Sequence, residues 1–163
     1  FYFTIMEQQN IKLLKDLLQK NMIQQQNIKL VKDLLHKFLS GDNQGYIDGC
    51  HTNFYGKIFS GLIPGGDLIQ GKEQLAKVFD ILPKYIDIIK FDAVDWCAVD
   101  NNVYFTVNWE FIWRPTDQLV KTSANVKKII VDGKIKEKYH IVNFTDVAGV
   151  AITWTLHNQY MSE

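Results

Sequence analysis

Two side chains in the second half of this sequence could do acid-base chemistry, and both lie in segments with strand-like spacing. His140 carries an imidazole whose ordinary pKa, near 6.5, suits proton transfer. Glu110 carries a carboxylate that could serve as a general acid or base. We take His140 and Glu110 as the candidate catalytic residues. For each residue we favour a structural interpretation: His140 as an exposed or interface histidine, and Glu110 as a glutamate at a subunit interface.

The run that contains His140 predicts a regular strand with two distinct faces. The lysines at positions 136 and 138 share a face with His140, and the other face carries Ile135, Glu137, Tyr139, Ile141 and Asn143. We expect the lysines to mark their face as exposed to solvent. Tyr139 and Asn143 are therefore predicted to face a pocket. His140 would do so only if a β-bulge redirected it.

Large aromatic side chains suggest what such a pocket would bind. Trp109 and Trp113 alternate with polar residues in the run 103–113, and an earlier strand-like run contains Tyr55. Their functional interpretation is a pocket wall that stacks a flat, largely apolar ligand. The alternative is simple core packing. We name Tyr55, Trp109, Trp113, Tyr139 and Asn143 as candidate ligand-binding residues.

These residues must be positioned by an antiparallel meander. The stretch 91–143 contains four strand-like runs separated by turn signals. Apolar and polar residues alternate along 103–113, as in a half-buried strand. Asp132-Gly133 is a strong two-residue hairpin signal, because a type I′ turn needs positive φ at both central positions. The aromatic face of this sheet must be covered by helices from earlier in the chain.

The first part of the chain contains a repeat. Residues 8–20 and 25–37 match at eleven of thirteen positions with an offset of 17. Each copy is amphipathic at helical spacing, but 17 residues rotate the apolar stripe by about 100°. We therefore expect a break at 21–24 and place only the second copy in the core. The repeat is either a docking element or, as we favour, a tandem duplication whose first copy is an appendage.

The middle of the chain completes the predicted order of elements. Gly41-Asp42 is expected to end the second copy, followed by a short helix at 43–50 and a strand at 54–59. A turn-rich loop at 61–66 precedes a well-patterned helix at 71–82, whose length Pro83 should limit.

This order resembles a known family, the SnoaL-like (polyketide cyclase-like) branch of the nuclear transport factor 2-like superfamily, which includes ketosteroid isomerases. The residues that carry the resemblance are F-L-S-G-D at 38–42, G-K-E-Q-L-A-K-V-F at 71–79, V-D-G-K-I at 131–135 and E-K-Y-H-I-V-N at 137–143. It implies an α+β cone, in which N-terminal helices pack into a strongly curved, mostly antiparallel sheet around an apolar pocket. It also implies a homodimer.

The resemblance divides the chain into a SnoaL-like domain at 25–144, an N-terminal extension at 1–24 and a C-terminal extension at 145–163. Within the extensions, residues 1–5 could be upstream of a natural start at Met6, and 148–156 could form an extra strand. The partner in the dimer is expected to cover the face of the 103–113 strand that carries Tyr104, Thr106, Asn108, Glu110 and Ile112.

The resemblance also shows where the catalytic residues of a ketosteroid isomerase would lie in this chain. Ketosteroid isomerase-like members use a Tyr, a general-base Asp and a protonated Asp. These positions fall near Leu34, Ile58 or Phe59, and Val126 in this chain, and all are apolar. Isomerisation of that type is therefore not expected.

Charge and composition exclude several classes of function. The formal net charge is zero and Arg114 is the only arginine, so no nucleic-acid or anionic-membrane footprint is present. No apolar run reaches the ~18 residues of a membrane span. Cys50 and Cys97 form no disulfide or zinc pattern and are expected to be buried free thiols in a reducing cytoplasm. No cofactor or metal is expected.

Three hypotheses follow. The first is a protein that binds a small apolar molecule in the cone. The second is a lyase or isomerase that uses His140, Tyr139 or Glu110. The third is a homodimeric association domain with the duplicated helix as its docking element.

Overall fold

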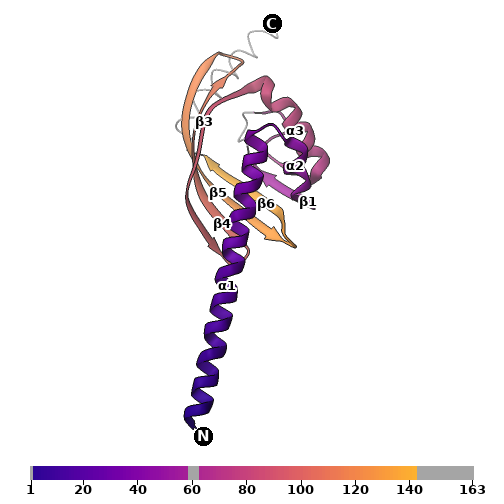
Figure 1. Ribbon diagram of the computed structural model, residues 1–163. Coiled ribbons are helices and arrows are strands. Elements are labelled where there is room, and N and C mark those ends of the chain that lie inside the picture. Colours follow the sequence, from indigo (N-terminus) through magenta and orange to yellow (C-terminus); the bar gives the residue numbers. More distant parts are fainter. Residues whose placement is uncertain (1, 59–62, 143–163) are drawn as a thin grey trace.

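A strongly curved six-stranded sheet wraps around three helices in the computed structural model, which describes residues 2–58 and 63–142 (Figure 1). The helices are α1 (Tyr2–Leu39), α2 (Asn43–Asp48) and α3 (Gly71–Tyr85). The strands are β1 (Cys50–Lys57), β2 (Ile69–Gln70), β3 (Ile86–Val99), β4 (Asn102–Trp113), β5 (Gln118–Val131) and β6 (Lys134–Val142). The order across the sheet is β2-β1-β6-β5-β4-β3. Only β1 and β6 pair in parallel, so the sheet is mostly antiparallel, as predicted.

The first helix corrects one prediction. Instead of breaking at 21–24, α1 runs without interruption from Tyr2 to Leu39, and its first half projects away from the sheet (Figure 1). The predicted conflict between the two apolar stripes does not arise, because the apolar residues of the first copy stay exposed, and this copy meets the domain through the ion pair of Lys20 with Asp100. The second copy is in the core as expected, with Val31, Leu34 and Leu35 buried.

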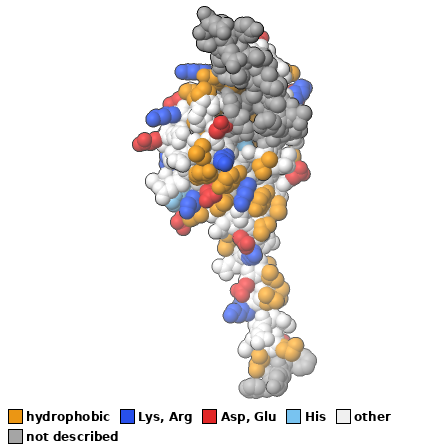
Figure 2. Space-filling view, turned by 180° about the vertical axis from the view of Figure 1, so that it is seen from behind, with side chains coloured by type: hydrophobic (Ala, Val, Ile, Leu, Met, Phe, Trp, Pro, Cys, Tyr) orange, Lys and Arg blue, Asp and Glu red, His pale blue; other side chains and the backbone are white. Residues whose placement is uncertain are grey.

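The first copy of the repeat exposes its apolar side chains. Figure 2 shows hydrophobic groups along the projecting helix. Each of the following residues has more than half of its side chain exposed: Ile11, Leu13, Leu14, Leu17, Leu18 and Met22. The two copies therefore have nearly the same sequence and opposite environments.

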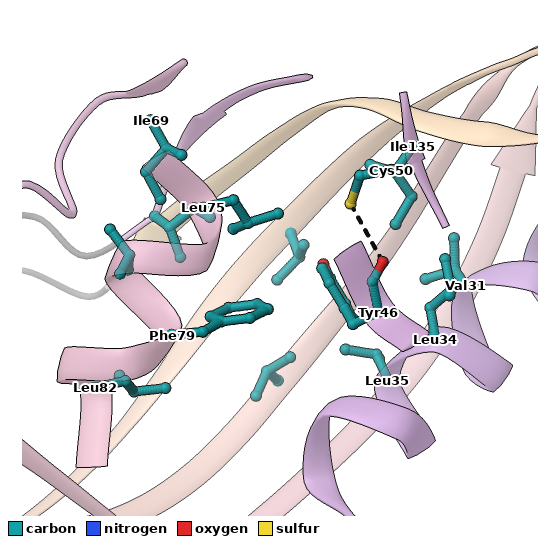
Figure 3. Close-up of a cluster of buried hydrophobic side chains, with 14 of the residues drawn as sticks. Val31, Leu34, Leu35, Tyr46, Cys50, Ile69, Leu75, Phe79, Leu82 and Ile135 are labelled. Atoms are coloured by element: carbon teal, nitrogen blue, oxygen red, sulfur yellow. Dashed lines mark hydrogen bonds between the residues drawn. The ribbon is translucent and has the colours of Figure 1, made fainter. Parts of the chain in front are cut away.

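The inner face of the sheet is the apolar face that the sequence predicted. Along β4, the odd-numbered residues from Val103 to Trp113 are buried, and the even-numbered ones are exposed or half-buried. The Asp132-Gly133 turn has φ of 51° and 68°, as a type I′ hairpin requires. Helix α3 buries Leu75, Val78, Phe79 and Leu82. Figure 3 shows Leu75, Phe79 and Leu82 among the side chains of the core.

Smaller corrections concern element ends and one thiol. Helix α3 continues through Pro83 to Tyr85, and β1 begins at Cys50, four residues earlier than predicted. Cys50 is buried as expected, but Cys97 is exposed, because it follows an irregularity in the pairing of β3 with β4. The predictions for Phe59 and for residues 143–163 concern positions outside the described residues.

A polar end in an apolar cone

A small cavity lies between the helices and the concave face of the sheet. Its volume is about 20 Å³, measured as room for the centre of a water-sized sphere, which is enough for about one water molecule. Ten of the side chains around it are apolar, and two are basic: Leu35, Phe38, Phe79, Leu82, Ile88, Phe91, Phe105, Val107, Trp109, Ala124, Lys138 and His140. The cone is thus nearly filled by its own side chains.

Trp109 forms the aromatic wall of this cavity. Its indole packs against Phe111 with ring centroids 4.6 Å apart and against the edge of Phe91 at 6.4 Å. The side chain is buried, and its Nε1–H has no hydrogen-bond acceptor within the described part of the chain. A buried indole N–H usually has a partner, so this wall offers an unused donor next to an apolar space.

Lys138 and His140 form the polar end of the cavity, which corrects the prediction that the lysines mark an outer face. Ile135 pairs with Ile130, but Glu137 pairs with Ile129, so Lys136 is an extra residue in β6. This β-bulge reverses the alternation after position 136. Lys138 is 7% exposed, whereas Ile141 on the opposite face is 71% exposed. His140 is thereby turned inward, which is the condition under which the sequence predicts a functional role for it.

A second lysine lies deeper, behind Lys138. The Lys128 side chain is fully buried and its Nζ donates to the Tyr46 hydroxyl at 3.4 Å. The amines of Lys128 and Lys138 lie 5.3 Å and 5.4 Å from the centroid of the Tyr46 ring. The Cys50 thiol points toward the same residue and donates to its carbonyl oxygen at 3.5 Å (Figure 3).

No carboxylate neutralises these two amines within the described residues. No Asp or Glu lines the cavity, and none of the ion pairs involves Lys128 or Lys138. Burial without a counter-ion disfavours the charged form of a lysine.

Burial shifts the pKa values of Lys138, Lys128, His140 and Cys50. Burial lowers the pKa of Lys138 to about 8. Burial, with a smaller effect of the neighbouring Lys138 charge, lowers the pKa of Lys128 well below its ordinary value. The pKa of His140 is also lowered, by burial and then by both lysines. For Cys50, burial raises the pKa to about 11.

Several solved structures share this architecture at low sequence identity. An NTF2-like protein from Burkholderia xenovorans is 16% identical with a TM-score of 0.69, over 77% of this chain and 95% of that one. The chain has the nuclear transport factor 2-like fold. A proposed SnoaL-like polyketide cyclase from Jannaschia sp. is 16% identical with a TM-score of 0.60, over 77% and 91%. TerC, co-crystallised with polyporic acid, is 13% identical with a TM-score of 0.67, over 77% and 98%. No family model and no curated protein matches the sequence.

Within this nuclear transport factor 2-like fold, the structure brings only part of the predicted set together. Trp109 and His140 line the cavity, and Tyr55, Trp113, Tyr139 and Glu110 do not. Trp113 is buried beside Tyr85, with ring centroids 5.7 Å apart. Glu110 lies on the outer face, where its carboxylate pairs with Lys121 at 3.1 Å.

The two predicted tyrosines lie next to each other, away from the cavity. The Tyr55 and Tyr139 rings are 6.0 Å apart, and the Tyr139 hydroxyl donates to Glu137 at 2.6 Å. That hydrogen bond raises the pKa of Tyr139 to about 12. Asn143 falls outside the described residues. The ligand-binding roles of Tyr55, Trp113, Tyr139 and Asn143 stay predictions.

Sequence reasoning missed Lys128 and Lys138. A lysine in a strand normally indicates the exposed face, and no residue near Lys136 signals a bulge.

Within residues 2–58 and 63–142, no three His, Cys, Asp or Glu side chains are arranged to hold a metal ion. None of the described helices is long and apolar enough to cross a membrane.

Proposed function

We propose that this protein binds a small, largely apolar molecule in the cone, with Trp109 as the aromatic wall and Lys138 and His140 at the polar end. The observation that carries the proposal is the composition of the cavity wall: ten apolar side chains and two convergent basic groups without a counter-ion. Ligand sites are mostly apolar, with a few polar groups that fix orientation. The co-crystal of TerC with polyporic acid supports ligand binding as a use of this fold.

Ligand entry requires movement of side chains, because the free space holds only about one water. Leu35 and Phe91 line the cavity, and both also line a depression on the surface beside Trp96. They form the wall between the two spaces. Rotation of Phe91, which is only half-buried on β3, would open a route from the depression to Trp109.

Quenching of tryptophan fluorescence by iodobenzene tests the proposal, because a bound heavy atom quenches an indole that it contacts. We expect saturable quenching in the wild type and its loss in Trp109→Phe. The matched control is Trp96→Phe, which should retain the quenching, since Trp96 lines the outer depression and not the cavity. Quenching that never saturates, or that persists unchanged in Trp109→Phe, would contradict the proposal.

The lyase or isomerase hypothesis in its sequence-based form gains no support from the geometry. Among its three residues, His140 faces the cavity, whereas Tyr139 and Glu110 lie on outer surfaces. A general acid and base must both reach the reacting atoms. Among the described residues around the cavity, the titratable groups are Lys138 and His140, so chemistry in the cavity would draw on these two.

Homo-association is the second candidate function, and the projecting half of α1 favours it. The first copy of the repeat exposes Ile11, Leu14, Leu17 and Leu18, whose counterparts Ile28, Val31, Leu34 and Leu35 pack on the sheet. We infer that a second copy of this chain covers that apolar face. Surfaces of this kind usually mark interaction sites.

Sedimentation at tens of micromolar tests this association and distinguishes it from pairing through the sheet. A dimer that Leu14→Glu dissociates would support the helix as the interface. The control is Asn108→Arg on the outer face of β4, which should leave the dimer intact. A monomer in the wild type would refute both interfaces, and dissociation by Asn108→Arg alone would favour the sheet face.

A further inference from the structure

Lys138 is an amine at the wall of an apolar cavity, and its structural contact is with the ring of Tyr46, whose centroid lies 5.4 Å from Nζ. It reaches that position only because the bulge at Lys136 turns it inward. A methionine of similar length would fill the same space without the cost of burying a charge. Lys128 at least donates to the Tyr46 hydroxyl at 3.4 Å.

We propose that Lys138 is a covalent capture site for small apolar aldehydes or ketones, which it binds as an imine. This inference rests on the proposed function, because the carbonyl compound must first occupy the cavity. It names the chemical class of the ligand and adds a reaction to the binding site.

The step requires no oxidant, reductant or metal. The neutral Nζ attacks the carbonyl carbon, a C–N bond forms, and the electron pair of the C=O π bond moves to oxygen. After proton transfer, the nitrogen lone pair expels the former carbonyl oxygen as water, giving the imine. A desolvated lysine beside another cationic group is an established arrangement for this kind of nucleophile.

The surroundings of Lys138 favour the neutral amine. The titratable groups around it are Lys128 on β5, His140 on β6, Tyr46 on α2 and Cys50 on β1. Burial lowers the pKa of Lys138 to about 8, so about a tenth of it is neutral at pH 7. An ordinary lysine with a pKa of 10.4 is neutral roughly 200-fold less often. The apolar wall also excludes the water that would hydrolyse the imine.

His140 is the group best placed to carry the protons. It lies two residues beyond Lys138 on the same face of β6, and both line the cavity. Its Nδ1 is buried without a partner in the described structure. Because its pKa is lowered, the imidazole is neutral at pH 7 and can accept one proton while donating another.

Reductive trapping tests the proposal directly. The protein is incubated with benzaldehyde and sodium cyanoborohydride at pH 7, and the benzylated lysines are identified by peptide mass mapping. We expect Lys138 to be labelled at least 10-fold faster than any of the other lysines. Lys138→Met should abolish the fast phase, and Lys136→Met, which changes the neighbouring half-exposed lysine, should retain it. Labelling spread evenly over surface lysines would overturn the inference.

Two measurements separate this inference from the proposed function. If iodobenzene quenches Trp109 saturably but Lys138 is not labelled preferentially, capture as an imine is refuted and ligand binding stands. If neither occurs, both fail. Should Lys138→Met fail to fold, mapping of the wild type still decides the site. The ratio of its labelling rate to that of the exposed lysines must fall as the pH rises from 7 to 10, because their neutral fraction is still increasing when that of Lys138 has levelled off, and a constant ratio contradicts the assignment.

Discussion

Lys138→Met should make this protein more stable, which is the opposite of the usual effect of a substitution in a core. The pKa of the Lys138 amine is about 8 in the fold and about 10.5 in the unfolded chain. At 1.36 kcal/mol per pH unit, that difference corresponds to about 3 kcal/mol of destabilisation at pH 7. Methionine gives up the contact of the ammonium with the Tyr46 ring. The expected net gain is therefore about 1–3 kcal/mol, in line with replacements of other buried charges.

The dependence on pH provides the sharper test. Below pH 8 both states bind the proton and the fold bears the whole cost. Between pH 8 and about 10.5 the unfolded chain binds more protons, so the free energy of unfolding of the wild type rises with pH. The gain from Lys138→Met should thus fall by about 1 kcal/mol between pH 7 and pH 9. Cys50, with its pKa raised to about 11, acts in the opposite direction above pH 9, which sets the upper end of the window.

Urea unfolding of wild type, Lys138→Met and Lys136→Met at pH 7 and pH 9 measures these quantities. In thermal unfolding at pH 7, Lys138→Met should have a melting temperature higher than that of the wild type by roughly 3–10 °C. Lys136→Met should change stability by less than about 0.5 kcal/mol, because it replaces a half-exposed side chain. If Lys138→Met is less stable than the wild type at both pH values, the amine is not buried without compensation and the reasoning is wrong.

Two further predictions concern the helices. At a protein concentration where the chain is monomeric, removal of residues 1–19 should leave the urea midpoint unchanged, since the apolar side chains from Ile5 to Leu18 are exposed. Leu34→Ala in the second copy should lower the free energy of unfolding by about 2–5 kcal/mol. Equal effects would show that the first copy packs on the domain. Gly49→Ala should cost about 1–3 kcal/mol, because its Cβ would overlap the Leu34 side chain, and an additive Gly49→Ala/Leu34→Ala double variant would contradict that contact.

The sequence predicted those parts of the fold that depend on local periodicity and turn chemistry. The alternation from Val103 to Trp113 identified the inner face of β4, and Asp132-Gly133 identified the last hairpin. The second copy of the repeat was placed correctly in the core. These features are decided within a few residues, so a pattern in the sequence contains them.

The errors arose where one residue's position depends on distant parts of the molecule. The continuity of α1 depends on whether the first copy has a surface to pack against, which periodicity cannot tell. Lys138 was assigned to solvent because a regular strand was assumed. Its burial depends on how β6 pairs with β5, and that register includes one extra residue. The polar half of the candidate site was therefore not recognisable, whereas its aromatic half, Trp109, was.

Deletion of Lys136 tests that register. If Lys136 is the extra residue, its removal leaves Ile135 opposite Ile130 and Glu137 opposite Ile129, now in regular alternation. Lys138 and His140 then still face the cavity, and we expect a loss of only about 1–2 kcal/mol, with preferential labelling of Lys138 retained. Deletion of Tyr139 is the matched control, because it turns His140 outward and should cost more than 3 kcal/mol. If β6 were a regular strand, the outcome would differ. Deletion of Lys136 would then move every later side chain of β6 to the opposite face of the sheet. Severe destabilisation by the deletion of Lys136 would therefore mean that β6 has no bulge and that Lys138 and His140 do not lie beside Lys128.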